Sequence, residues 1–342
     1  MTDFMNTRIL LEKRPFGEPK DDDFKIETVP VIDPKEGEIL LKTLWLSLDP
    51  YMRGRMNDAK SYAPPVGLGE VMVGETVNQV VVSKSSDFAV GEIVVGPVGW
   101  QSYATVEPNP TEFRKVDTTM GPISTALHVL GMTGRTAYFG LLKVGDPKLG
   151  ETVVVAAASG AVGSVVGQIA KIKGCRIVGI AGGQKKCDYI LNELGFDAAI
   201  DHKGGNMAAE LKAACPDGID VYFENVGGEV LQAVVPLLNP GARVPICGYV
   251  SQYNKTSPTE VESPFDVLGK LPDPPPHRFF LVYEWIKEWS TASAEMSGWV
   301  ETGRLKYMES VVEGIENAPQ TFRGLLRGEN FGKQLIKVAN PD

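Results

Sequence analysis

A short turn of small residues carries the clearest chemical pattern in the chain. The stretch AASGAVG places Ala157, Gly160 and Gly163 in the spacing A-x-x-G-x-x-G, between the apolar run 151–158 and the helix-like run 164–174. Small residues allow a tight turn and let the backbone approach a pyrophosphate, whose charge then meets the N–H groups at the start of the helix. A glycine pattern alone is weak, but its place between strand and helix predicts a dinucleotide-binding turn. A glycine-rich packing turn is the alternative.

The next predicted strand ends without the acid that holds the ribose in NAD-binding chains. That acid is expected about 20 residues after the glycine turn, where RIVGIAGGQKKCDY (176–189) offers Gly182, Gly183, Lys185 and Lys186. Glycines leave room for a bulkier group, a lysine can meet a 2′-phosphate, and no carboxylate repels that phosphate. The stretch therefore predicts NADPH rather than NADH as the cofactor. At least one of the two lysines is expected to be only a solvated residue at a helix start.

Composition and charge exclude several other classes of function. The chain has 342 residues, 43% of them hydrophobic and 23% charged, which is enough for two domains with separate cores. The net charge of −9 argues against nonspecific electrostatic binding to nucleic acid or anionic lipid. No apolar run approaches the roughly 20 residues that span a bilayer, and no signal-peptide pattern is visible at the N-terminus.

Cysteines and histidines show neither a disulfide framework nor metal-ligand spacing. The four cysteines and three histidines are scattered along the chain: Cys175, Cys187, Cys215, Cys247, His128, His202 and His277. In a chain of this size such cysteines are typical of reduced thiols. We therefore expect a cytoplasmic protein without a metal site.

The elements that must position these residues follow two different patterns of secondary structure along the chain. Residues 1–126 hold short strand-like runs broken by turn residues, which suggests a small barrel or sandwich. From residue 127 strands alternate with helices, as in a parallel sheet built from βαβ units. Six strand candidates follow in this part: ETVVVAAA (151–158), RIVGIAG (176–182), DAAIDH (197–202), GIDVYFENV (218–226), ARVPICGYV (242–250) and RFFLVYEW (278–285). The fold class predicted is α/β, with a doubly wound Rossmann sheet and a second, mostly β domain.

Two further segments bear on this organisation. The tail GKQLIKVA (332–339) has the pattern of a strand and is expected to return to the first domain. Residues 285–300 place a row of large or apolar side chains at helical spacing: Trp285, Trp289, Ala292, Met296 and Trp299. We interpret that row as a packing face, with a cofactor or substrate contact as the alternative.

Several motifs, taken together, resemble one known superfamily. They are GMTGRTAYFGL (131–141), ETVVVAAASGAVGSVVGQIAKIKGC (151–175), YFENVGG (222–228), ICGYVSQYN (246–254) and ENFGKQLIKV (329–338). The chain resembles the zinc-independent medium-chain dehydrogenase/reductases. Within them, LSLDPYMRGRM (46–56) and GIENAPQTFRGLLRGENFGK (314–333) are typical of the alkenal/one double-bond reductases, which include prostaglandin reductases and bacterial curcumin reductases.

The resemblance implies an architecture and a partner. It implies a GroES-like catalytic domain over 1–126, completed by 309–342, and a Rossmann NADP-binding domain over 127–308. It also implies an active site in the cleft between the domains and a homodimer joined through the Rossmann sheets. Where zinc-dependent relatives carry a cysteine and a G-H-E motif, this chain has Asp49 and Gly74-Glu75.

Individual cofactor contacts also follow from the resemblance. The pyrophosphate loop falls on Gly160, Ala161, Val162 and Gly163, and the 2′-phosphate site on Lys186 beside Gly182. His202 stands where many members have a tyrosine for that phosphate, so its contribution would depend on pH. The other family positions around the cofactor fall on Asn225, Cys247, Phe279, Asn330, Met132 and Thr133. For Cys247 the alternative is a buried apolar residue, and for Met132 and Thr133 it is packing at the domain junction.

Two tyrosines are the candidates for catalysis. Hydride transfer to the β-carbon of an α,β-unsaturated carbonyl leaves negative charge on the carbonyl oxygen, which a positioned hydroxyl can stabilise. The resemblance places Tyr253 of SQYN beside the nicotinamide ribose and the substrate oxygen, and Tyr51 of DPYMR across the cleft. Packing is the alternative for each. Arg53 and Arg55 are expected to support their loop.

The function predicted is NADPH-dependent reduction of the C=C bond of enals and enones, including curcumin-like or prostaglandin-like substrates. An NADPH:quinone oxidoreductase is the nearest alternative, because it shares the fold and the cofactor. A non-catalytic NADPH-binding protein is the alternative of another class. DPYMR and SQYN together favour the enone reductase.

Overall fold

The computed structural model describes residues 4–342, and the chain divides into two compact units. The first unit consists of the chain up to Leu127 together with Glu309–Asn330 and Gln334–Asp342. The second consists of His128–Met308 and Phe331–Lys333. The C-terminal part of the chain therefore contributes to both units.

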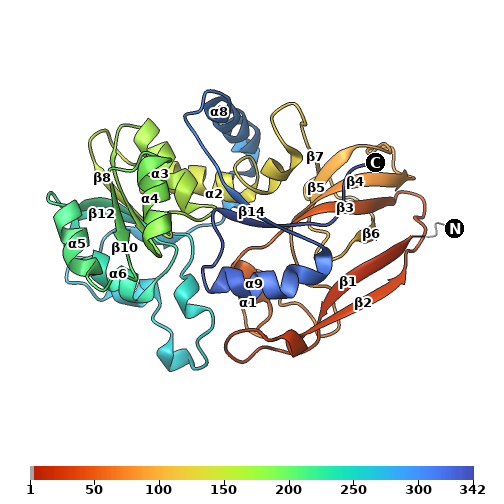
Figure 1. The fold of residues 1–342 in the computed structure, drawn as a ribbon, viewed down its shortest axis with the longest axis horizontal. Helices are drawn as coiled ribbons and strands as arrows, with labels where there is room; N and C mark the ends of the chain where they lie inside the picture. The colour runs from red at the N-terminus through yellow and green to blue at the C-terminus, as the bar shows by residue number, and fades with distance from the viewer. Residues whose placement is uncertain (1–3) are drawn as a thin grey trace. The chain divides into compact units, whose positions relative to one another are not determined.

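The second unit is built on a six-stranded parallel sheet (Figure 1). Its strands are β8 (Thr152–Ala156), β9 (Arg176–Ala181), β10 (Ala198–Asp201), β11 (Ile219–Phe223), β12 (Leu238–Ile246) and β13 (His277–Phe279), in the order β10-β9-β8-β11-β12-β13. This is the doubly wound order, whose direction reverses between β8 and β11. The predicted Rossmann sheet is confirmed.

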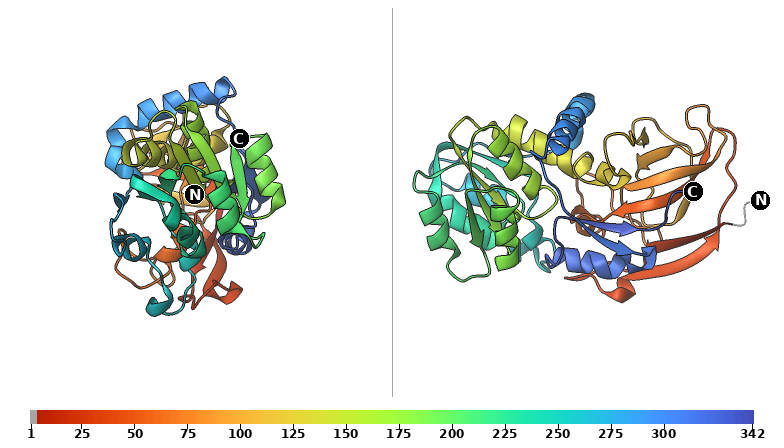
Figure 2. Two further views of the ribbon diagram at one scale, coloured as in Figure 1. Left: turned by 90° about the vertical axis from the view of Figure 1, so that its left-hand side faces the viewer. Right: turned by 45° about the horizontal axis from the view of Figure 1, so that its top comes forward.

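Helices cover both faces of that sheet (Figure 2). The helices of this unit are α2 (Met132–Phe139), α3 (Gly163–Ile172), α4 (Gln184–Asn192), α5 (Met207–Ala214), α6 (Gly228–Val234), α7 (Pro264–Gly269) and α8 (Trp289–Glu301). Every residue of β8 is buried, as expected of a central strand covered on both faces. Val154, Val178, Tyr222 and Val244 of four neighbouring strands share one core cluster with residues of α5 and α6.

The last strand and the helix after it differ from the sequence prediction. The strand expected over 278–285 ends at Phe279, and residues 282–288 form a 3-10 helix in which Trp285 has a non-helical backbone. The Glu284 carboxylate accepts a hydrogen bond of 2.8 Å from the Leu281 N–H, which stabilises this early turn. The predicted packing face is confirmed for the four residues within α8, which are buried: Trp289, Ala292, Met296 and Trp299. Trp285 is only partly buried and stacks on Phe139 with ring centroids 5.4 Å apart.

The first unit is mostly β, as predicted. Its strands are β1 (Met5–Leu11), β2 (Phe24–Pro30), β3 (Ile39–Ser47), β4 (Thr76–Ser83), β5 (Ile93–Gly96), β6 (Tyr103–Val106), β7 (Arg114–Lys115), β14 (Glu309–Glu313) and β15 (Lys333–Lys337), and its helices are α1 (Tyr51–Arg55) and α9 (Ala318–Leu326). β1 and β2 form a separate antiparallel pair, and the others form one sheet in the order β14-β15-β3-β4-β5-β7, with β6 also paired to β3.

The C-terminal tail completes this unit. Leu335 of β15 pairs with Ser47 of β3 in antiparallel register, so the tail returns to the first domain as expected. The fully buried Trp100 lies between Phe24, stacked at 5.7 Å, and Phe322 of α9, edge-on at 5.5 Å. An aromatic cluster thus ties the tail to the N-terminal strands.

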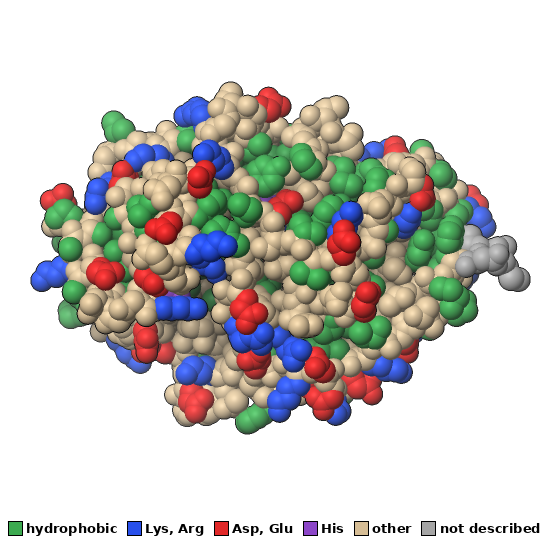
Figure 3. Space-filling view, viewed as in Figure 1, with side chains coloured by type: hydrophobic (Ala, Val, Ile, Leu, Met, Phe, Trp, Pro, Cys, Tyr) green, Lys and Arg blue, Asp and Glu red, His purple; other side chains and the backbone are tan. Residues whose placement is uncertain are grey.

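The surface carries charges of both signs. On the face drawn in Figure 3, acidic and basic side chains alternate without one sign covering a large area. Across residues 4–342, no helix has both the length and the apolar character needed to cross a bilayer.

Candidate functional site

The turn between β8 and α3 has the geometry expected of a phosphate-binding loop. Gly160 N–H donates to the Ala157 carbonyl oxygen at 2.9 Å, and a Cβ at position 163 would lie 2.3 Å from that same oxygen. Gly163 therefore cannot be replaced without moving the turn. α3 begins at Gly163 and, among the described residues, no side chain caps its first turn. The residues between, Ala161 and Val162, bring the backbone to the helix N-terminus, where a pyrophosphate binds favourably.

A segment near the C-terminus braces this turn. Gly332 N–H donates to the Ser159 carbonyl at 3.0 Å, and Gly332 forms a parallel bridge with Gly160. Gly332 has φ +69°, and a Cβ there would lie 2.0 Å from the Met308 carbonyl oxygen, so this position also requires glycine. Asn330, predicted to contact the cofactor, lies two residues before Gly332 and belongs to the first unit.

The end of β9 explains the missing acid. A Cβ on Gly182 would lie 2.8 Å from Nε2 of His202, because the imidazole lies against this glycine. The nearby carboxylate of Asp201 is already engaged, since it accepts the N–H groups of Gly183 at 2.7 Å and Lys203 at 2.9 Å. These two backbone bonds hold the pKa of Asp201 below its usual value. The acid at this edge therefore stabilises the backbone.

Positive charges converge on the same edge. Partial burial, and then the charge of Lys203, lowers the pKa of Lys186. Desolvation likewise lowers the pKa of His202, followed by the charges of Lys203 and Lys186, with Asp201 opposing them. Three groups that destabilise one another's positive charge form a site that an added phosphate dianion would stabilise. The sequence pattern did not single out Lys203, although it directly follows His202 in IDHK.

The structure also separates the two lysines of α4. Lys185 is exposed, and its Nζ lies over the ring of Phe331, 5.8 Å from the centroid. The same ring packs edge-on against Tyr189 of α4 at 4.8 Å. Lys186 is the lysine that interacts with Lys203 and His202. Lys185 therefore supports the C-terminal segment, and Lys186 is the candidate ligand of a 2′-phosphate.

Asn225 lies where the strand order reverses, between the carboxyl ends of β8 and β11. Its side-chain amide donates to the Ala156 carbonyl, the last residue of β8, at 2.7 Å. Its own carbonyl accepts the Val250 N–H at 3.1 Å, which joins the β11 turn to the loop after β12. Ligands bind at this reversal in open α/β sheets, so Asn225 occupies a favourable position for a cofactor contact.

Cys247 and Phe279 belong to neighbouring strand ends. Cys247 directly follows β12, and its N–H donates to the Glu224 carbonyl at 2.9 Å. Burial raises the pKa of the Cys247 thiol to about 12, so the thiol stays protonated at neutral pH. Phe279 is the last residue of β13 and pairs with Ile246 of β12.

Tyr253 follows a short 3-10 helix, η5 (Val250–Gln252), in the loop after β12. Its hydroxyl oxygen accepts the Tyr249 N–H at 3.4 Å, and the two rings meet edge-on at 5.6 Å. The same oxygen lies 2.8 Å from where a Cβ on Gly248 would be, so the close approach depends on that glycine. A phenol that accepts one bond keeps its proton for donation to a second partner.

The remaining predicted residues lie at two places. Met132 and Thr133 begin α2, and the buried Thr133 hydroxyl donates to the His128 carbonyl at 3.1 Å, a packing role within the second unit. Tyr51 begins α1 in the first unit, where it packs against the core cluster around Met52. The structure therefore groups Tyr253 with the second unit's residues and Tyr51 with the first unit's.

The two arginines beside Tyr51 support loops, as expected. The buried Arg53 guanidinium donates to the Gly17 carbonyl at 2.9 Å and to Asn57 at 2.6 Å. Arg55 donates to the Pro64 carbonyl at 2.5 Å.

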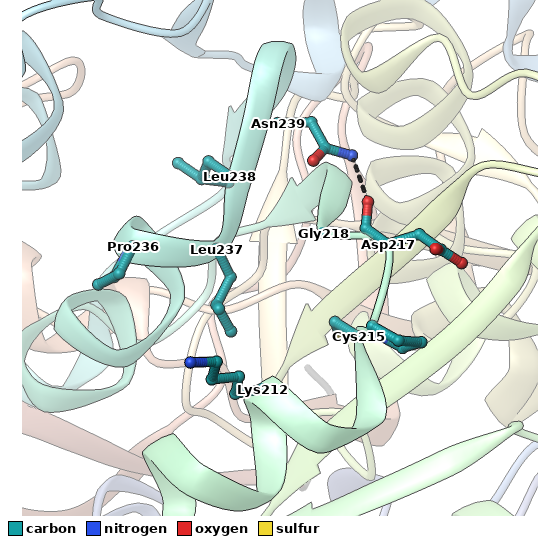
Figure 4. Close-up of a pocket in the computed structure, with 9 residues that line it drawn as sticks. Lys212, Cys215, Asp217, Gly218, Pro236, Leu237, Leu238 and Asn239 are labelled. Atoms are coloured by element: carbon teal, nitrogen blue, oxygen red, sulfur yellow. Dashed lines mark hydrogen bonds between the residues drawn. The ribbon is translucent and has the colours of Figure 1, made fainter.

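A hollow of about 530 Å³ lies at the opposite end of the same sheet (Figure 4). It is lined by the residues around the starts of β11 and β12, including Lys212 and Gly218, and the Asn239 amide donates across it to the Asp217 carbonyl at 3.0 Å. The phosphate turn and Asn225 follow carboxyl ends of strands, so this hollow is separate from the candidate site.

Within residues 4–342, no group of three His, Cys, Asp or Glu side chains is placed to hold a metal ion.

Known proteins share this arrangement along nearly the whole chain. Residues 7–116 match a family model described as the N-terminal domain of oxidoreductase, and residues 161–269 match one described as zinc-binding dehydrogenase. The chain is 48% identical to the NADPH-dependent curcumin reductase of Escherichia coli (strain K12), covering 98% of both. It is 43% identical to prostaglandin reductase 1 of Bos taurus, covering 96% of this chain and 98% of the relative.

A solved structure agrees with these relatives. The structure of CurA in complex with NADPH from Vibrio vulnificus has a TM-score of 0.93 and 48% identity, covering 98% of this chain and 100% of that one. The chain belongs to the zinc-independent medium-chain dehydrogenase/reductases. The branch predicted from the motifs, that of the alkenal/one double-bond reductases, is confirmed by the curcumin and prostaglandin reductases.

Lys186 and Lys185 form a matched pair for testing the phosphate site. Replacing Lys186 by alanine should weaken NADPH binding about tenfold, the effect of losing one charge-assisted hydrogen bond. It should leave NADH binding nearly unchanged, because NADH lacks the 2′-phosphate. Lys185→Ala should change neither affinity much. Equilibrium titration of cofactor fluorescence measures all four values; equal losses from the two variants would contradict the assignment.

His202 should make cofactor selectivity depend on pH. The pKa of His202 is lowered in the cofactor-free protein, and a bound 2′-phosphate favours the imidazolium, so NADPH binding takes up a proton. The ratio of NADPH to NADH affinity should therefore rise from about pH 8 to about pH 6.5, above the phosphate's own pKa of about 6. In His202→Gln the ratio should be flat over this range. A ratio with the same slope in both proteins would exclude His202 from the phosphate site.

Proposed function

We propose that this chain is an NADPH-dependent reductase of the C=C bond of α,β-unsaturated aldehydes and ketones. The observation that carries the proposal is its near-full-length similarity to relatives named as reductases of curcumin and of prostaglandins. The grouping of Lys186, His202 and Lys203 beside Gly182 supports the choice of NADPH.

The residues of the second unit fit this cofactor. A glycine cradle that a Cβ would fill lies at Gly163, and a Cβ at Gly182 would meet the side chains of His202 and Lys203. We propose that the pyrophosphate binds at Gly160–Gly163 and the 2′-phosphate at Lys186, His202 and Lys203. Asn225, Cys247, Phe279, Asn330, Met132 and Thr133 are proposed as the other contacts. When bound, NADPH supplies the hydride.

The tyrosines then provide the polar chemistry. As the hydride forms a C–H bond at the β-carbon, the π electrons of the C=C bond move toward the carbonyl and leave an enolate. The hydroxyl of Tyr253 donates a hydrogen bond to the enolate oxygen and lowers the barrier. The reaction ends when a proton bonds to the α-carbon and restores the carbonyl. Tyr51 is proposed as a second donor from the first unit.

We also propose that the protein acts as a cytoplasmic homodimer joined through its Rossmann sheets. β13 is the terminal strand of the six-stranded order, and large apolar side chains are exposed beside it in sequence: Phe265, Tyr283 and Ile286. Terminal strands and exposed apolar residues both favour association. All four cysteines are free, as suits a reducing compartment. Light scattering should give twice the mass of one chain; the mass of a single chain would contradict the dimer.

The test of the proposed function is cofactor oxidation with four acceptors. The purified protein is supplied with NADPH or NADH and with a 2-alkenal, a benzylideneacetone-type enone, curcumin or a quinone, and products are identified by mass. We expect saturated carbonyl products and a strong preference for NADPH. Turnover of the quinone alone would instead identify a quinone oxidoreductase. NADPH binding without turnover of any acceptor would favour a non-catalytic NADPH-binding protein.

The tyrosine assignment predicts a loss in kcat rather than in cofactor binding. Tyr253→Phe should lower kcat on the best enone by about a hundredfold, since one lost donor to an oxyanion costs on the order of 3 kcal/mol. Tyr51→Phe should lower kcat less if Tyr253 is the main donor. Tyr249→Phe is the control, because it keeps both the backbone N–H and the ring that contact Tyr253 and removes only a hydroxyl. Full kcat in both of the first two variants would exclude a tyrosine donor.

A further inference from the structure

A fully buried carboxyl lies directly behind the proposed cofactor contacts. Glu224 follows β11 and immediately precedes Asn225, and its side chain has no exposed surface. Its Oε1 accepts three hydrogen bonds, from Val226 N–H at 2.6 Å, Gly227 N–H at 2.9 Å and the Tyr222 hydroxyl at 3.0 Å. Its Oε2 is buried and has no hydrogen-bond partner among the described residues. Burying a carboxyl oxygen without a hydrogen-bond partner costs free energy, so this atom calls for an explanation.

The backbone of this region joins the two loops that carry the proposed site. The Glu224 carbonyl accepts the N–H groups of Cys247 at 2.9 Å and Gly248 at 3.3 Å. Two residues further on, the Val226 carbonyl accepts the Ser251 hydroxyl at 2.6 Å. The turn 224–228 is therefore fixed to the loop that leads to Tyr253, and the Glu224 carboxyl forms the centre of that turn.

The pKa of Glu224, the midpoint between its protonated and its ionised form, lies near neutral pH. Burial raises its pKa to about 7, although the bonds from Gly227, Val226 and Tyr222 oppose the rise. The groups that interact with it electrostatically are Tyr222 on its own strand and Cys247 after β12. Burial raises the pKa of both, so neither brings a compensating positive charge. Ionised and protonated Glu224 are thus both populated near neutral pH.

We propose that Glu224 is a positioning residue whose ionisation controls the affinity of the cofactor site. The ionised carboxylate accepts charge-assisted bonds from Val226 and Gly227 and holds the turn, and with it Asn225, in the geometry that binds the cofactor. Protonation weakens these bonds, because neutral hydrogen bonds are about half as strong as charge-assisted ones. The inference rests on the proposed function in one respect, that Asn225 contacts NADPH.

The sign of the effect follows from linkage. If the cofactor binds better to the ionised form, binding releases a proton from Glu224, and affinity rises with pH. This direction is opposite to that expected from His202, whose protonation favours the 2′-phosphate. The two effects separate in a His202→Gln background, where only the Glu224 effect remains.

The test is the Kd for NADPH between about pH 6.5 and about pH 8, above the phosphate's own pKa of about 6, in His202→Gln and in His202→Gln/Glu224→Gln. In the first protein affinity should rise about fivefold with pH, the size expected when neutral bonds become charge-assisted. In the second it should be flat, because glutamine still accepts the two N–H groups but does not ionise. The variant His202→Gln/Tyr222→Phe lacks one donor to the carboxylate, so the midpoint of its rise in affinity with pH should move to higher pH. Circular dichroism verifies that each variant is folded.

Three results would overturn the inference: a flat profile in His202→Gln, a slope that persists with Glu224→Gln, or an affinity that falls as pH rises. If Glu224→Gln alone fails to fold, the pH midpoint of affinity in the Tyr222→Phe variant decides. An unshifted midpoint in that variant would also overturn the inference. Failure of the proposed function is distinguishable, since it would show as absent NADPH binding or absent turnover in the unaltered protein.

Discussion

The candidate site depends on one close approach, between the carbonyl oxygen of Ala157 and the backbone of Gly163. Because a Cβ at residue 163 would lie 2.3 Å from that oxygen, the chain can turn directly from β8 into α3 only with glycine there. β8 is central in a parallel sheet, so its carboxyl end lies beside those of β9 and β11. The turn therefore brings the α3 N-terminus, the β9 edge and Asn225 into one region. The bridge from Gly332 to Gly160 adds a distant part of the chain to the same turn.

Acids and bases have divided roles around this turn. Asp201 ends β10 and Glu224 follows β11, and both carboxyl groups accept backbone N–H groups and stabilise turns. Desolvation, and then the charge of Lys203, instead lowers the pKa of Lys186 and of His202, and a bound anion would oppose both shifts. Two lysines and a histidine therefore interact at the end of β9 although the chain carries a net charge of −9. Local arrangement, rather than overall charge, decides which cofactor is preferred.

The sequence predicted what depends on short spacing. Six apolar runs identified the Rossmann strands, and A-x-x-G-x-x-G located the phosphate turn, because both patterns reflect backbone geometry within a few residues. The resemblance alone placed Lys186 at the 2′-phosphate; the different role of Lys185 depends on Phe331, which lies far away in the sequence and packs against α4 only in the folded unit. The burial of Glu224 was not predictable, since nothing in ENVGG distinguishes an exposed acid from a buried one. The end of β13 at Phe279 was also missed, because the apolar run continues into a 3-10 helix.

The central claim is that hydride passes from NADPH to the β-carbon of an enone. The most direct measurement is to supply NADPH in which both C4 hydrogens are deuterium, isolate the product of a benzylideneacetone-type enone, and locate the label by mass spectrometry and NMR. The account predicts a saturated ketone with one deuterium on the former β-carbon and none on the carbonyl carbon. Deuterium on the carbonyl carbon of an unsaturated alcohol, or a reduced product without label, would contradict it.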